Sequence, residues 1–151
     1  MEKSKAGFTL IEILVIFAIF TVLLSLTTAS FSTIERTDKL NSAISEITSI
    51  LSLAQSQTIS GNSLGGENPL QFEVYFEADR FTLLPEDIPT ELPKGIRIIS
   101  INLPQGKIIF ARVTGQVSNF DPEKNFLILK EERTNLEKKV MINKLGVVTV
   151  E

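Results

Sequence analysis

The chain has 151 residues, with 15 basic and 18 acidic side chains, and it contains neither cysteine nor histidine. The absence of cysteine excludes disulfides and thiolate chemistry. The absence of histidine removes the usual catalytic base and the commonest transition-metal ligand, so His-dependent nucleophile arrangements are excluded and zinc sites nearly so. The composition therefore argues against an enzyme and predicts no cofactor and no metal.

An apolar segment begins at Phe8 and contains one charged residue, Glu12. Residues 13–34 carry no charge, and this length is about that needed to cross a hydrocarbon core of roughly 30 Å. Lys3 and Lys5 precede the segment, so the positive-inside bias predicts a cytoplasmic N-terminus with the rest of the chain outside. A charge at the bilayer centre costs roughly 2.5–3.5 kcal/mol, which predicts a function for Glu12 beyond simple anchoring.

Three interpretations of this segment compete. A secretory signal peptide would be cleaved near Thr28-Ala29-Ser30, and a plain single-pass anchor would not be cleaved. Glu12 argues against both, because neither needs a carboxylate among apolar residues. The third interpretation is a leader, residues 1–7, that ends before the apolar segment. Cleavage after Gly7 would create a positive amino group on Phe8, four residues from Glu12.

Residues 5–15, KAGFTLIEILV, resemble the N-terminal motif of the type IV prepilin family. The resemblance implies that a membrane peptidase cleaves between Gly7 and Phe8 and N-methylates Phe8. It also implies that the Phe8 ammonium and the Glu12 carboxylate of a neighbouring subunit neutralise each other in an apolar filament core, where either charge alone is expensive. The implied partners are the prepilin peptidase/methyltransferase, other pilins or pseudopilins, an assembly platform protein and membrane lipid.

The first half of the predicted helix, residues 8–33, is apolar all round and is expected to form the transmembrane and filament-core part. Residues 34–60 are expected to continue it as an amphipathic helix, because no glycine or proline intervenes and apolar residues recur every three or four positions. These residues are Leu40, Ala43, Ile44, Ile47, Ile50, Leu51 and Ala54. The glycines and Pro69 of residues 61–69 predict a helix stop and a loop.

The rest of the chain, residues 70–151, predicts a β-rich extracytoplasmic head. Strands are expected at residues 70–76, 80–84, 96–103, 107–113, 126–131, 140–143 and 147–150. The acidic, proline-containing stretch 85–93 predicts a loop, while Pro104-Gln105-Gly106 and Leu145-Gly146 predict hairpin connections. The predicted fold class is α+β and pilin-like, with a long N-terminal helix packed against an antiparallel sheet.

Within the prepilin family, the layout is most similar to the GspH/FimT type of minor pilins and pseudopilins. Three features carry this resemblance: residues 50–57 at the helix end, residues 107–110 with the following Gly115, and the closing residues 139–148. Two positions depart from the pattern. Many members have a proline where Ala29 stands and an arginine where Gln55 stands.

The sequence favours a structural subunit of a type IV pilus or a type II secretion pseudopilus, first held in the inner membrane and then added to a filament. The acids concentrated in residues 67–93 and the bases of residues 94–151 form either two solvated faces or complementary patches between subunits. A competence-type pseudopilin or a DNA-binding FimT-like receptor is the alternative. Nucleic-acid contacts would then come from Lys130, Arg133, Lys138, Lys139 and Lys144. The acidic total and the absence of tryptophan argue against that alternative.

Overall fold

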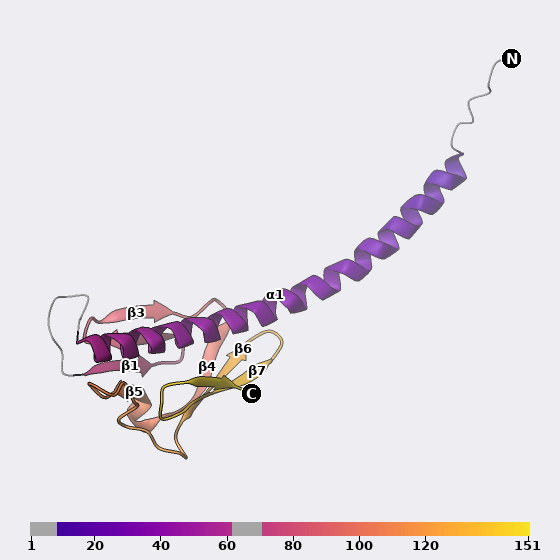
Figure 1. Ribbon diagram of the computed structural model, residues 1–151. Helices are drawn as coiled ribbons and strands as arrows, with labels where there is room; N and C mark the ends of the chain where they lie inside the picture. Colours follow the sequence, from indigo (N-terminus) through magenta and orange to yellow (C-terminus); the bar gives the residue numbers. More distant parts are fainter. Residues whose placement is uncertain (1–8, 62–70) are drawn as a thin grey trace. The chain divides into compact units, whose positions relative to one another are not determined.

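The computed structural model describes residues 9–61 and 71–151, without the side chains of 26–36. The predicted leader, Phe8 and most of the predicted loop 61–69 therefore lie outside the described residues. The chain divides into two compact units, Met1–Arg36 and Thr37–Glu151. Helix α1, Leu10–Ser60, begins in the first unit and ends in the second (Figure 1).

Strands follow the helix in the second unit. They are β1 (Phe72–Phe76), β2 (Arg80–Leu84), β3 (Ile88–Glu91), β4 (Ile96–Asn102), β5 (Lys107–Phe110), β6 (Phe126–Glu131), β7 (Glu137–Ile142) and β8 (Val148–Val150), with a short 3-10 helix η1 (Pro104–Gly106) before β5. They form two antiparallel sheets, sheet A with the order β3-β2-β1-β5 and sheet B with the order β4-β6-β7-β8. The predicted α+β, pilin-like class is confirmed.

The predicted apolar stripe of the helix forms the centre of the core. Leu40, Ala43, Ile47 and Ala54 are fully buried, and Ile50 is half-buried at the edge of the stripe. Alternate residues of both sheets complete one continuous cluster. Its largest fully buried sheet residues are Phe72, Phe76, Phe81, Phe110, Leu83, Leu127, Leu129 and Ile142. Because one helix face and two sheet faces share this cluster, burial of apolar surface positions the strands that contribute to it, whereas β3 and β8 contain no buried residue.

The hairpin of β1 and β2 was predicted from alternation, and the structure confirms it. In β1, Phe72, Val74 and Phe76 are buried while the residues between them face outward. Phe76 pairs with Phe81 across the hairpin, with ring centroids 6.2 Å apart. This distance lies in the range that favours aromatic pairs, so the contact adds to area burial.

The loop prediction for residues 85–93 was wrong, because β3 lies within it. β3 is the edge strand of sheet A, where it pairs Thr82 with Pro89. The Leu92 amide donates to the Asp79 carbonyl at 2.9 Å. Because the backbone amides of an antiparallel strand point alternately toward and away from the neighbouring strand, the amide position of residue 89 points away from β2. A proline at such a position removes no ladder hydrogen bond, which explains how a strand forms there.

The predicted hairpin at Pro104-Gln105-Gly106 was also wrong. This segment is η1, which carries the chain from β4 in sheet B to β5 in sheet A. The largest differences in strand limits are of three residues: the strand from Lys107 ends at Phe110 instead of 113, and β7 begins at Glu137 instead of 140. The predicted connection at Leu145-Gly146 is confirmed, since β7 and β8 pair directly across it.

Candidate functional site

Helix α1 begins with a side-chain cap at Thr9. The Glu12 amide donates to Thr9 Oγ1 at 3.3 Å and to the Thr9 carbonyl at 3.1 Å, and the Ile13 amide donates to the same carbonyl. A threonine at this position satisfies an amide that the helix itself leaves unpaired. The helix therefore starts two residues after the predicted cleavage point. The signal was present in the sequence as a threonine followed three residues later by a glutamate, but it was missed.

Apart from Glu12, the side chains of the first turns of α1 are mostly apolar on every side. Large apolar side chains between Leu10 and Leu24 are 43% to 82% exposed within the chain. The Thr21 hydroxyl donates to the Phe17 carbonyl at 2.8 Å, and the Ser25 hydroxyl donates to the Val22 carbonyl at 2.7 Å. Both hydroxyls are thereby satisfied inside the helix, as an apolar surrounding requires.

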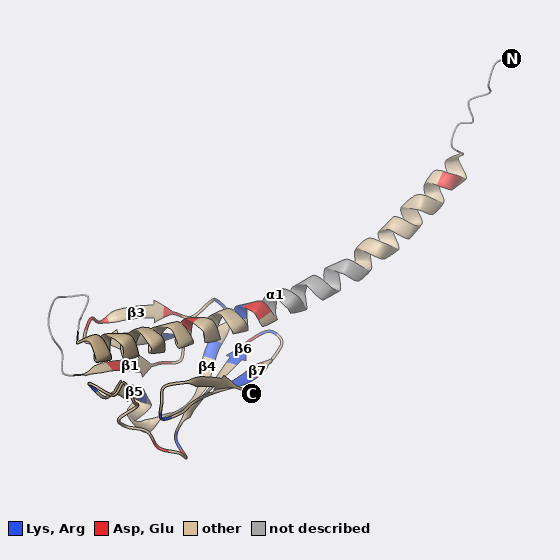
Figure 2. Ribbon diagram, in the orientation of Figure 1, with Lys and Arg blue, Asp and Glu red and all other residues tan. Residues whose placement is uncertain are grey.

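Unlike Thr21 and Ser25, Glu12 does not bond through its side chain to the described backbone of its own helix. It is exposed in the first turn of α1, and in the described part of the chain its carboxylate has no hydrogen-bond or ion-pair partner. Its side chain lies in the first turn, beside the amides that the helix leaves unpaired. Glu12 is the acidic residue of the first turn of α1, and Figure 2 shows acidic colouring near this end of the helix.

The processing residues Gly7 and Phe8 lie outside the described residues, so their pairing with Glu12 remains a prediction. Sequence analysis also predicted a transmembrane segment in this region. Among the residues that the structure describes, no helix combines the length and the apolar character needed to span a membrane.

Bases outnumber acids on sheet B, where Lys or Arg residues lie on β4, β6 and β7 (Figure 2), whereas sheet A carries Glu73 and Glu91 together with Arg80 and Lys107. Two of the predicted nucleic-acid contacts lie on the outer face of sheet B and are paired there. Lys130 lies 3.2 Å from Glu137, and Lys139 lies 3.8 Å from Glu151. Lys139 also lies over the Phe126 ring, 4.8 Å from its centroid. The structure therefore places acids beside both lysines.

The other three cations lie elsewhere. Lys138 donates to Asn41 Oδ1 at 2.7 Å and so points toward helix α1. Arg133 is in the turn between β6 and β7, where its amide donates to Glu131 at 3.1 Å. Lys144 is exposed in the turn between β7 and β8. The five cations do not share one face, and in the described ranges no cluster of acidic residues could hold a metal ion.

Gln55 joins three distant segments at the end of the helix. Its amide nitrogen donates to the Gly115 carbonyl at 2.7 Å and to the Leu145 carbonyl at 2.8 Å. These are the three segments on which the GspH/FimT resemblance was based. Sequence reasoning singled out position 55 only as a departure and missed its role in holding two turns.

Two glycines allow this close approach. Gly115 has φ +65°, and a Cβ there would lie 2.6 Å from Ile59 Cδ1. Gly146 has φ +79°, and a Cβ there would lie 2.9 Å from Phe110 Cε1. Side chains are disfavoured at both positions by backbone conformation and by contact. The turns at the helix end are thus specified by glycine as well as by Gln55.

Comparison with known families gives one match. The model of the prokaryotic N-terminal methylation motif matches residues 3–28, a region that includes Gly7, Phe8, Thr9 and Glu12. Searches of curated proteins and of solved structures found no match. The motif is that of precursors that are processed by prepilin peptidase and assembled with other pilins, and it implies membrane anchoring. The chain therefore carries the N-terminal methylation motif, which fits a type IV prepilin-like protein.

Proposed function

We propose that the chain is a structural subunit, a minor pilin or pseudopilin, of a type IV pilus or a type II secretion pseudopilus. Prepilin peptidase cleaves it after Gly7 and methylates Phe8. It is held in the inner membrane with its N-terminus in the cytoplasm and its head outside, and then enters a filament. The match to the methylation motif supports the processing step. The finer assignment to the GspH/FimT type rests on the resemblance of residues 50–57, 107–110 and 139–148, from which position 55 departs.

The observation that carries this proposal is the contrast between Glu12 and the two hydroxyls of the same helix. Thr21 and Ser25 bond to their own backbone, so they can enter an apolar environment at little cost. Glu12 has no such bond in the described part of the chain. A buried carboxylate requires a partner of opposite charge. The amino group that cleavage creates on Phe8 of a neighbouring subunit provides that partner.

The test replaces Glu12 by leucine in the full-length chain. Glu12→Leu removes a charge from an apolar segment, so membrane insertion is expected to stay intact or improve. Incorporation into filaments is expected to fall strongly, because an unpaired buried amine costs about 3–5 kcal/mol. The measurement is the fraction of mature protein recovered in sheared filaments rather than in membranes.

The matched control is Ile16→Leu, which changes a neighbouring apolar position and leaves the charge in place. It should be incorporated as well as the unaltered chain. Equal incorporation of Glu12→Leu and Ile16→Leu would show that Glu12 has no role in assembly.

A further inference from the structure

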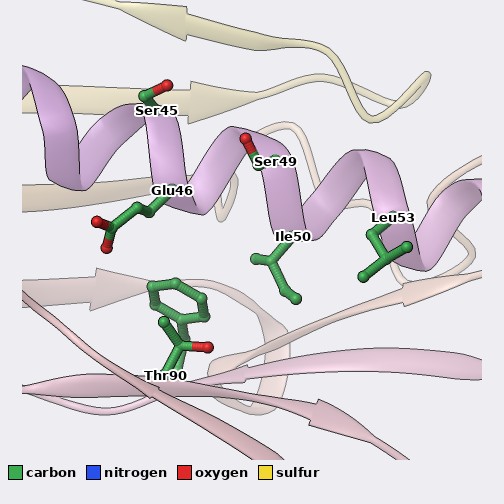
Figure 3. A pocket seen from close by; sticks show the side chains of 7 residues that line it. Ser45, Glu46, Ser49, Ile50, Leu53 and Thr90 are labelled. Atoms are coloured by element: carbon green, nitrogen blue, oxygen red, sulfur yellow. The ribbon is translucent and has the colours of Figure 1, made fainter.

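A groove lies between helix α1 and the β2–β3 edge of sheet A, with a volume of about 270 Å³. Glu46, Ile50 and Leu53 extend from the helix toward Thr90 on β3 (Figure 3). Phe81 also lines the groove, so its floor is apolar, and Leu53 is 40% exposed there. The groove is smaller than the roughly 300–1,000 Å³ of small-molecule sites, which suits a side chain better than a ligand.

Glu46 places one negative charge at the rim of this apolar floor. The part of the chain that the structure describes gives Glu46 no ion-pair partner, while other acids of the head, such as Glu73 and Glu77, are paired. A partner that fits this groove would present two neighbouring residues: an apolar side chain for the apolar floor and a cation for the carboxylate.

The turn between β7 and β8 presents such a pair, Lys144 and Leu145. Both are exposed, and Leu145 exposes 57% of its surface. Asn143 Oδ1 accepts hydrogen bonds from the amides of Leu145 at 2.9 Å and Val147 at 3.0 Å. The Leu145 carbonyl accepts a bond from Gln55. The turn is therefore held rigidly before any contact, which lowers the entropy lost on docking.

The groove and the turn lie on opposite flanks of the same helix. Glu46 lines the groove, and Gln55 holds the turn. These residues are nine positions apart, or about two and a half turns, so their side chains point in opposite directions. The turn of one copy can therefore meet the groove of another copy only.

We propose that the Lys144–Leu145 turn of one copy docks into the α1–β3 groove of a second copy. Leu145 lies against Ile50 and Leu53, and the Lys144 ammonium pairs with Glu46. The contact is heterologous, because it joins two different surfaces. After two copies have docked, one copy still has a free groove and the other a free turn, so further copies can be added in the same orientation to form an open filament. The inference rests on the proposed function, because assembly of the N-terminal helices brings the heads side by side.

The geometry fixes an offset between neighbouring heads. The turn is level with Gln55, and the groove extends from Glu46 to Leu53 around Ser49. The groove residues that the turn would contact, from Leu53 back to Glu46, lie two to nine residues before Gln55, which corresponds to about 3–14 Å along the helix. Neighbouring copies are thus displaced by this distance along the axis of α1.

The test is disulfide cross-linking in the full-length chain, which has no native cysteine. Glu46→Cys and Lys144→Cys are placed on two differently tagged copies that are expressed together, and filaments are oxidised. A heterodimer containing both tags is the expected product. The matched control replaces Glu46→Cys by Glu123→Cys, an exposed position outside the groove, and is expected to give at least five-fold less dimer. Adding Leu145→Asp to the Lys144→Cys copy should lower the dimer yield several-fold, because it removes the apolar contact.

The outcomes separate this inference from the proposed function. Protein that is cleaved after Gly7 and found in filaments, yet yields no more dimer than the Glu123→Cys control, would overturn the docking of turn and groove while leaving the proposed function intact. Protein that is neither cleaved nor incorporated would refute the proposed function, and with it this inference.

Discussion

Replacing Gln55 by methionine removes both hydrogen bonds that hold the turns at the end of α1 and keeps the length of the side chain. The donors reach the Gly115 and Leu145 carbonyls at 2.7 and 2.8 Å, so both are well-formed bonds. Each such bond contributes about 1 kcal/mol net. The free energy of unfolding is therefore expected to fall by about 2 kcal/mol.

Urea unfolding of the full chain in detergent measures this change. With a slope of about 2 kcal/mol per molar urea, the midpoint is expected to fall by about 1 M while the slope stays constant. Tyr75 is the only tyrosine and the chain has no tryptophan, so its fluorescence reports on sheet A. Ser52→Ala on the exposed side of α1 is the control and should change stability by less than about 0.5 kcal/mol. A midpoint for Gln55→Met equal to that of Ser52→Ala would refute the role assigned to the amide.

Two further predictions concern glycines. Gly7→Val is expected to prevent cleavage, because a bulky side chain does not fit a site for small residues, and a mature-sized band on a gel would contradict this. Gly146→Ala is expected to destabilise the head more than Gly115→Ala, since the added Cβ meets the fully buried Phe110 ring, whereas Ile59 is 55% exposed and can move. Equal urea midpoints for the two alanine variants would show that the buried ring yields as easily as the exposed side chain.

The sequence predicted the parts of the fold that depend on periodicity. The helix stripe around Ile47 and the alternation in β1 are local patterns, and both correspond to burial in the structure. The edge strand β3 escaped prediction because proline and acidic residues are typical of loops, and only its place at the edge of a sheet makes them compatible with a strand. The division into two sheets escaped for a related reason: η1 looks locally like a hairpin, and strand partners are decided by long-range packing.

The candidate site shows the same limit. Glu12 could be singled out because one charge among apolar residues is visible in the sequence alone. The roles of Gln55 and of the Lys144–Leu145 turn depend on contacts between segments 60 to 90 residues apart. No local pattern marks a glutamine as the anchor of two turns. The five predicted cations are close together in the sequence, but the fold places them on different faces of the head.

Pro89 has a consequence for heads that are crowded together. In the proposed filament, subunits joined through their N-terminal segments would experience one another at an effective concentration in the millimolar range. At such concentrations an open strand edge would recruit the strands of adjacent copies and fuse the sheets. The missing amide of Pro89 denies an incoming strand one of its anchoring donors at the edge of sheet A. In the proposed filament, the sheets of neighbouring heads are thereby kept from joining edge to edge.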